Sequence, residues 1–145
     1  MQPLPHHYAV EATGEQSGPV QLKAPGVTPL ATQAPPEFGG PGGCWSPESL
    51  LVAAVADCYV LSFRAVARAS KLAWVDLKVR VEGVLDRVDG VTRFTGFVVH
   101  PDLLLPDASQ QALAESVLEK SKRACLVSNS LVAGCELQLA IRIAA

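Results

Sequence analysis

The feature that most constrains the fold is a nearly uninterrupted apolar run from Leu50 to Ala67. The segment before it, Ser46-Pro47-Glu48, is typical of a helix start. It offers a capping hydroxyl, a proline whose missing N–H costs nothing at this position, and an acid that complements the helix dipole. These residues predict a helix over about residues 46–70. Because this helix is apolar on all sides, we expect it to be buried.

An apolar run of this length also suits a transmembrane helix. Two observations favour a core helix instead: Asp57 and Arg64 lie within the run, and strand patterns precede and follow it. The N-terminal residues 1–7 also lack the basic region and apolar stretch of a secretion signal. We therefore expect a cytoplasmic chain that does not contact a membrane.

Composition favours one domain over residues 1–145. Of the 145 residues, 49% are apolar and 18% are charged, which indicates a large core. The 12 Lys and Arg residues against 14 Asp and Glu residues give a net charge of −2 without any block of like charge, so no basic surface for nucleic acid is expected. The apolar content exceeds what a monomer of this size hides, which predicts an oligomer, in the simplest case a dimer.

Patterns with a period of two predict strands on both sides of the helix. Short antiparallel strands joined by loops are predicted in the first 45 residues, which carry most of the prolines. After the helix, alternation from Trp74 predicts a strand with one solvent-exposed face, and Asp89-Gly90 predicts a hairpin turn into a partner strand over residues 91–100. A second helix begins near Pro106 and ends or kinks between residues 125 and 129, and a last strand covers residues 135–143. These elements predict an α+β fold with a mainly antiparallel sheet.

Four cysteines are the main candidates for chemistry. Their spacing contains no CxxC pair and no Cys/His cluster, so a structural zinc site has little support. In a cytoplasmic chain, free thiols are more common than structural disulfides. Cys58, in the middle of the apolar helix, suits either a small core residue or a reactive thiol, and no cation lies one helical turn away to lower its pKa.

The other three cysteines give weaker signals. Lys122, one turn before Cys125, either favours the Cys125 thiolate or is a solvated surface residue. Cys44 and Cys135 have no predicted partner and are interpreted as structural or incidental thiols. The position of Glu48 is explained by the helix dipole alone.

Several motifs occur in a characteristic order. They are Phe38-Gly39-Gly40-Pro41-Gly42-Gly43, Ser46-Pro47-Glu48-Ser49-Leu50-Leu51, Ala56-Asp57-Cys58 and Ala124-Cys125-Leu126-Val127-Ser128-Asn129-Ser130. With this motif set, the chain resembles the OsmC/Ohr family of organic hydroperoxide reductases from about residue 38 to the C-terminus. The resemblance implies an intertwined homodimer in which mainly antiparallel sheets wrap central buried helices.

The resemblance also implies an activity and its residues. It implies a thiol-dependent peroxidase that reduces organic hydroperoxides to alcohols and uses no metal, haem or other cofactor. By motif, Cys58 is the peroxidatic cysteine, Cys125 is the resolving cysteine, and Glu48 is the acid that orients the thiolate network. An external dithiol then reduces the resulting disulfide.

The chain departs from the Ohr pattern at the activating cation. Ohr enzymes have an arginine in a loop after the first strand, whereas residues 12–18 contain none and the first arginine is Arg64. Leu126 also replaces a common proline. These departures indicate a divergent member and keep a second interpretation open, a non-peroxidatic binding or redox-sensing module with an apolar pocket at the dimer interface. The replacement cation is left open among Lys23, His6, His7 and an arginine of the partner.

Helix geometry gives a further expectation about Glu48 and Cys58. Ten residues at 1.5 Å each place them about 15 Å apart along one straight helix. If both serve one site, Glu48 comes from the other subunit. We therefore expect two sites in each dimer, each built from Cys58 of one chain and Glu48 of its partner.

Overall fold

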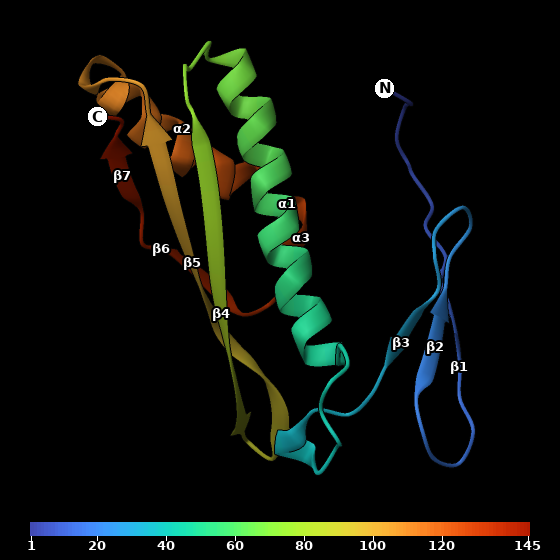
Figure 1. Cartoon of the computed structure of the whole chain (residues 1–145). Helices are drawn as coiled ribbons and strands as arrows, with labels where there is room; N and C mark the ends of the chain where they lie inside the picture. The colour runs from blue at the N-terminus through green and yellow to red at the C-terminus, as the bar shows by residue number, and fades with distance from the viewer. The chain divides into compact units, whose positions relative to one another are not determined.

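The structure, a computed structural model, describes all 145 residues and divides into two compact units, Met1–Leu50 and Leu51–Ala145. Figure 1 shows the order of the elements along the chain. Helix α1 (Pro47–Ala69) starts in the last residues of the first unit and runs through the second. The prediction of a helix over residues 46–70 is confirmed. That residues 1–145 form one domain stays a prediction.

The first unit contains a small antiparallel sheet. Its strands β1 (Glu11–Thr13), β2 (Val20–Lys23) and β3 (Leu30–Thr32) pair in chain order. A 3-10 turn, η1 (Pro36–Phe38), follows. Within this unit only Thr32 and Ser46 are buried, and no hydrophobic side chain is. The short antiparallel strands predicted for this region are present, but they enclose no core.

The glycine-rich loop after β3 depends on Gly40. A Cβ atom added at this residue would lie 1.7 Å from the carbonyl oxygen of Ala34, far inside van der Waals contact. The amide of Gly40 donates a 3.0 Å hydrogen bond to the carbonyl oxygen of Pro35. This close approach of two backbone segments requires glycine and turns the chain towards α1.

The start of α1 is capped as predicted. Ser46 and Ser49 bond reciprocally: the amide of Ser49 donates to Ser46 Oγ over 3.1 Å, and the amide of Ser46 donates to Ser49 Oγ over 2.9 Å. These bonds satisfy two amides that would otherwise lack partners at the helix start. Pro47 occupies the first helical position, where its missing N–H is harmless.

A long hairpin dominates the second unit. Strands β4 (Asp76–Val88) and β5 (Val91–Leu105) pair antiparallel. The turn between them has Asp89 at φ 52° and Gly90 at φ 77°, the left-handed conformation that the Asp-Gly pair predicts. Side chains alternate in burial along both strands, so one face of the hairpin carries the core.

The last predicted strand is in fact two strands. β6 (Gly134–Leu137) and β7 (Ala140–Ile143) both pair parallel with β5, in the same register. The break between them lies opposite Pro101. The amides of Gln138 and Ala144 donate hydrogen bonds to the carbonyl oxygens of Val99 and Leu105. The backbone groups of every second β5 residue, in the series that contains Val99 and Leu105, therefore face β6 and β7. Pro101 faces the same way but has no N–H to donate, which interrupts the ladder.

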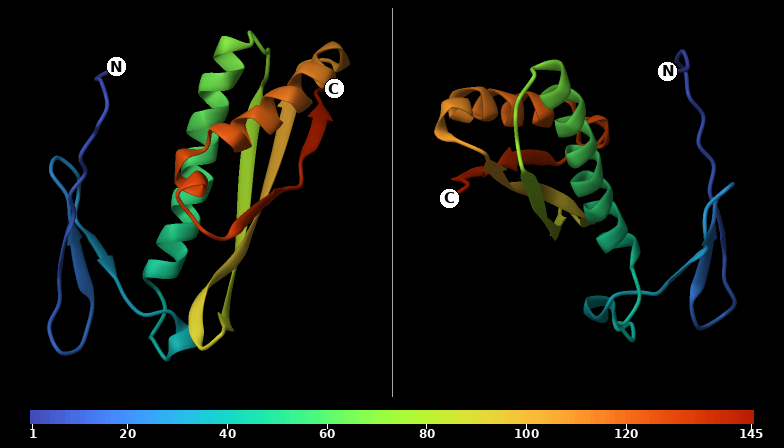
Figure 2. Two further views of the ribbon diagram at one scale, coloured as in Figure 1. Left: turned by 180° about the vertical axis from the view of Figure 1, so that it is seen from behind. Right: turned by 45° about the horizontal axis from the view of Figure 1, so that its top comes forward.

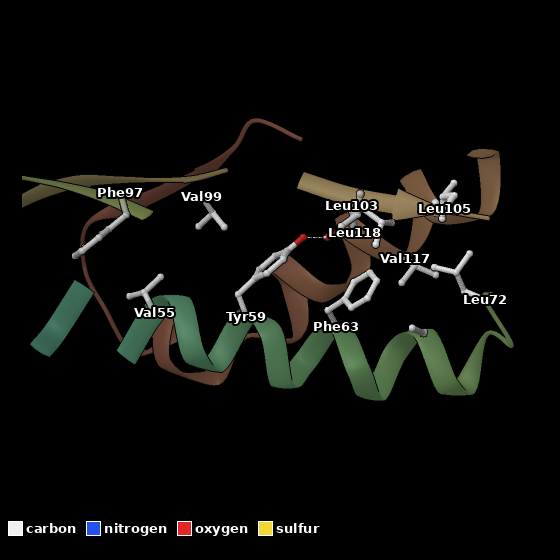
Figure 3. Packing of buried hydrophobic residues seen from close by; sticks show 12 residues of the cluster. Val55, Tyr59, Phe63, Leu72, Phe97, Val99, Leu103, Leu105, Val117 and Leu118 are labelled. Carbon is white, nitrogen blue, oxygen red and sulfur yellow. Dashed lines mark hydrogen bonds between the residues drawn. The ribbon is translucent and has the colours of Figure 1, made fainter. Parts of the chain in front are cut away.

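Helices α1 and α2 (Gln111–Ala124) cover one face of this sheet (Figure 2). The 3-10 turn η2 (Ala108–Gln110) leads into α2, and the single helical turn α3 (Leu126–Asn129) follows after one extended residue. Figure 3 shows side chains of α1 directed towards those of β5 and α2. The hydrophobic core consists of Val55, Tyr59, Phe63, Ala67, Leu72, Phe97, Val99, Leu103, Leu105, Ala114, Val117 and Leu118.

The expectation that α1 is buried on all sides is wrong for the single chain. Its buried residues are spaced by four, from Val55 to Ala67, so they form one stripe. On the opposite side Leu61 is 54% exposed. One sheet covers only one side of a helix, which leaves the other apolar side uncovered. α1 is long and apolar enough to cross a membrane, but the core helix of a soluble domain meets the same test.

Candidate active site

Two cysteines that are far apart in the sequence meet between α1 and α3. Cys58 is half-buried in the middle of α1. Cys125 is the single extended residue between α2 and α3, with φ −69° and ψ 99°, and its side chain is 2% exposed. Cys125 raises the pKa of the Cys58 thiol, and the backbone N–H of Val127, in α3, lowers it. The structure therefore brings together the two cysteines that the motifs single out.

The residues after Cys125 hold its backbone in place. The carbonyl oxygen of Cys125 accepts bonds from the Ser128 hydroxyl at 3.1 Å and from the Asn129 amide at 3.0 Å. The side-chain amide of Asn129 donates a 3.0 Å bond to the carbonyl oxygen of Arg123, at the end of α2. The Ser128-Asn129 pair thus fixes the break between α2 and α3, and Cys125 is the residue at that break.

Burial is the largest influence on Cys58 and raises the pKa of its thiol. The backbone N–H of Val127 lowers this pKa, Cys125 raises it, and the Ser62 hydroxyl lowers it. No positive charge is among these influences. The exposed side chain of Asp57 is not among them either. In the single chain, burial therefore favours the neutral thiol of Cys58.

Comparison of the sequence with known protein families points to the same family as the motifs. A family model described as OsmC-like protein matches residues 40–140. The chain belongs to the OsmC family. An uncharacterized protein of Bacillus subtilis, YmaD, is 33% identical over 108 residues, which are 72% of this chain and 72% of that relative. The family predicted from the motifs is confirmed.

Solved structures support the same OsmC fold. An OsmC-like protein of unknown function from Vibrio cholerae superposes with a TM-score of 0.83 at 18% identity, over 93% of this chain and 99% of that one. A Legionella pneumophila structure described as an organic hydroperoxide resistance protein OsmC has a TM-score of 0.75 at 25% identity, over 96% and 98% of the two chains. An organic hydroperoxide resistance protein of Elizabethkingia anophelis gives 0.78 at 20% identity, over 99% and 100%. The predicted α+β fold is confirmed.

The structure does not place Glu48 beside Cys58 within this OsmC chain. Glu48 lies in the first turn of α1, ten positions before Cys58 on the same continuous helix. Its Oε2 atom is buried without a hydrogen-bond partner. A buried carboxylate oxygen without a donor is costly. Glu48 and Cys58 are thus separated along one straight helix, as expected from their spacing in the sequence.

A third thiol near the pair was not expected. Cys135 lies on β6, and burial raises the pKa of its thiol, Lys122 lowers it, and Cys125 raises it. The sequence suggested that Lys122 acts on Cys125, one helical turn away, whereas in the structure Lys122 acts on Cys135. The sequence named no partner for Cys135, and the interpretation of Cys135 as a structural or incidental thiol stays a prediction. The sequence held one signal: Cys135 alternates with charged Glu136, which places Cys135 on the inner face of the last strand.

The remaining cysteine is separate from this group. Cys44 lies in the first unit and is exposed. Three of the four cysteines thus lie together in the second unit, around the junction of α2, α3 and β6.

Proposed function

We propose that this OsmC-family protein is a thiol-dependent peroxidase that reduces organic hydroperoxides to alcohols. Cys58 is the peroxidatic cysteine, and Cys125 is the resolving cysteine. The observation that carries the proposal is the proximity of these two thiols between α1 and α3, where Cys125 raises the pKa of Cys58. Two structural relatives described as organic hydroperoxide resistance proteins give additional support.

The reaction runs through two half-reactions. The thiolate of Cys58 attacks the distal oxygen of the hydroperoxide, the O–O bond breaks, and the alcohol leaves after taking up a proton. Cys58 is left as a sulfenic acid. The thiol of Cys125 then attacks this sulfur and releases water, which forms a Cys58–Cys125 disulfide. An external dithiol reduces the disulfide and becomes oxidised itself, in the cytoplasm.

Apolar hydroperoxides suit this site better than hydrogen peroxide. Cys58 is flanked on α1 by the buried side chains of Val55 and Tyr59. An alkyl tail that leaves water gains about 25 cal/mol for each Å² of apolar surface buried. Hydrogen peroxide has no such surface, so it gains nothing from the apolar surroundings.

The active form in this proposal is a homodimer. Strands of three or four residues that bury no hydrophobic side chain, as in the first unit, are not stable on their own. The outer side of α1 is also apolar and uncovered around Leu61. A second copy of the chain supplies the missing cover for both. In this arrangement each site combines Cys58 of one chain with the partner's Glu48, whose buried Oε2 lacks a donor in the single chain.

One observation favours a second candidate function. Burial raises the pKa of Cys58, and no positive charge in the chain opposes it. A thiol that stays protonated near neutral pH reacts slowly with peroxides. The second candidate is therefore a non-peroxidatic binding or redox-sensing module, in which the apolar dimer interface holds a ligand.

Thiol counting separates the two candidates. The reduced protein is mixed with cumene hydroperoxide, and free thiols are measured over time. The peroxidase loses two thiols per chain, Cys58→Ser abolishes this loss, and Cys125→Ser leaves Cys58 as a sulfenic acid that dimedone traps. Cys44→Ser is the matched control, since Cys44 is exposed in the other unit. No thiol loss in the wild type at millimolar peroxide rejects the peroxidase in favour of the binding module.

A further inference from the structure

A cavity of about 540 Å³ lies at the junction of α2, α3 and β6 in the second unit. Cys135 lines it together with Lys122 and Arg123, from the last turn of α2, and Ser128 and Asn129, from α3. The cavity thus places a thiol beside charged side chains, which also include the acid Glu119, and neither Cys58 nor Cys125 lines it.

The chain segments on either side of the resolving cysteine line this cavity. The lining residues Lys122 and Arg123 come just before Cys125 in the chain, and Ser128 and Asn129 come just after it. Cys125 itself is 2% exposed. Cys125 is therefore a buried residue between two segments that line the cavity together with Cys135. The effect of Cys125 on the ionisation of Cys135 agrees with this placement.

We propose that Cys135 is an exchange cysteine that carries the disulfide from the buried pair to the cavity, where an external dithiol reduces it. This inference rests on the proposed redox function of Cys58 and Cys125. It assigns a role to the third thiol of the group and identifies the cavity as the site of reductant attack.

The exchange step conserves atoms and electrons. The thiolate of Cys135 attacks Sγ of Cys125 in the Cys58–Cys125 disulfide, a Cys125–Cys135 bond forms, and Cys58 leaves as a thiolate that takes up a proton. A dithiol then attacks Sγ of Cys135 and releases Cys125 as a thiol. The second sulfur of the dithiol closes its own disulfide and releases Cys135. The net result is one oxidised dithiol and a fully reduced protein.

One feature of the cavity suits this role. Burial raises the pKa of Cys135, and Lys122, which lines the cavity, opposes this rise. Lys122 thus favours the thiolate that the attack requires. The exchange also requires the Cα atoms of Cys125 and Cys135 to approach to about 4.4–6.8 Å. The segment that joins them contains one helical turn, α3, and no strand. Any such approach has to work against the bonds from Ser128 and Asn129 that hold the backbone of Cys125.

The test uses a disulfide made without peroxide. Wild type, Cys135→Ser, Cys135→Ala and the control Cys44→Ser are oxidised with diamide, an oxidant of thiol pairs. Release of thiols by dithiothreitol is then followed in a single turnover. Both Cys135 variants should be reduced about tenfold more slowly than wild type, and Cys44→Ser should match wild type. Circular dichroism melting of each variant checks the fold, and two different substitutions separate loss of the thiol from a packing defect.

A crosslink test completes the experiment. In Cys58→Ser, diamide should produce a Cys125–Cys135 disulfide that non-reducing peptide mass spectrometry detects. Absence of this crosslink, or wild-type reduction rates in both Cys135 variants, overturns the exchange role. If the crosslink forms and the rates fall while cumene hydroperoxide oxidises no thiol in the wild type, the exchange role stands and the peroxidase proposal fails.

Discussion

The hydroxyl of Tyr59 donates a 2.9 Å hydrogen bond to the carbonyl oxygen of Leu118 and so ties α1 to α2 (Figure 3). Tyr59 is 1% exposed and directly follows Cys58 in the chain. Burial and the nearby Glu119, Cys125 and Cys135 raise the pKa of its phenol. Burial therefore keeps Tyr59 protonated, and the bond fixes the helix that carries Cys58.

Replacing Tyr59 by phenylalanine tests this tie. The ring stays in the core while the hydroxyl is lost, so Tyr59→Phe should lower the free energy of unfolding by about 0.5–1.5 kcal/mol. Urea unfolding at pH 7.5 measures the difference.

The same variant has a defined pH dependence. The pKa of Tyr59 is higher in the folded protein than in the unfolded chain, where it is about 10. Below about pH 10 Tyr59 therefore contributes its full stabilisation to the folded state. Above about pH 10 the unfolded chain loses the phenol proton first, and this stabilisation is lost as the pH rises. The stability gap between wild type and Tyr59→Phe should therefore narrow from pH 9 to pH 11. A gap that widens over this range contradicts the assignment.

Reactivity of Cys58 should rise with pH well beyond neutrality. Burial raises the pKa of its thiol above the ordinary value, so the thiolate fraction grows about tenfold for each pH unit from 7 to 8.5. The rate of Cys58 alkylation by iodoacetamide, followed by mass spectrometry, measures this dependence. A rate that is already constant at pH 7 would show that the assembled protein supplies a cation that the single chain lacks.

Ser128 should matter for the resolving step. Its hydroxyl donates to the carbonyl oxygen of Cys125 over 3.1 Å, and Ser128→Ala removes this bond at a cost of about 0.5–1.5 kcal/mol. This bond positions the backbone of Cys125 between α2 and α3. Peroxide-treated Ser128→Ala should therefore form the Cys58–Cys125 disulfide several-fold more slowly than wild type. Ser130→Ala is the control: it removes a similar bond, from Ser130 Oγ to Leu126 O at 2.8 Å, beyond the break. Equal disulfide rates in the two variants argue against a positioning role for Ser128.

Gly83 on β4 should not tolerate a side chain. An added Cβ would lie 2.9 Å from Phe94 Cε1 and 3.0 Å from both Phe97 Cε1 and Val52 Cγ2. Gly83→Ala should therefore cost about 1–3 kcal/mol through overpacking. At Gly134 on β6 an added Cβ meets nothing within 4 Å, so Gly134→Ala should change stability by less than about 0.5 kcal/mol. Thermal unfolding of both variants measures this contrast.

The uncovered side of α1 should govern dimer formation. Leu61→Asp places a charge on a surface that the proposed dimer buries, so it should weaken dimerisation by at least about tenfold. Val84→Asp changes a residue of similar exposure, 56% against 54%, on the outer face of β4, and should leave the dimer intact. Sedimentation equilibrium measures both. A wild-type monomer, or a Leu61→Asp dimer as tight as wild type, contradicts the proposed assembly.

Local chemistry made several elements predictable from the sequence. The Ser46-Pro47 start of α1, the Asp89-Gly90 turn and the end of α2 near Cys125 are confirmed. Each depends on residues within one or two turns of each other, whose backbone preferences act in any context. The motif set also identified the family, because its order along the chain is specific.

The tertiary structure decided what depends on distant residues. The split of the last strand follows from Pro101 on a neighbouring strand, which no pattern within residues 135–143 reveals. The meeting of Cys58 with Cys125, and the presence of Cys135 beside them, likewise depend on how α1, α2 and the sheet pack. Periodicity tells which side of an element is apolar, but only packing decides what covers it. By itself the sequence therefore determined the elements, the family and the candidate thiols, and the fold determined which thiols are neighbours.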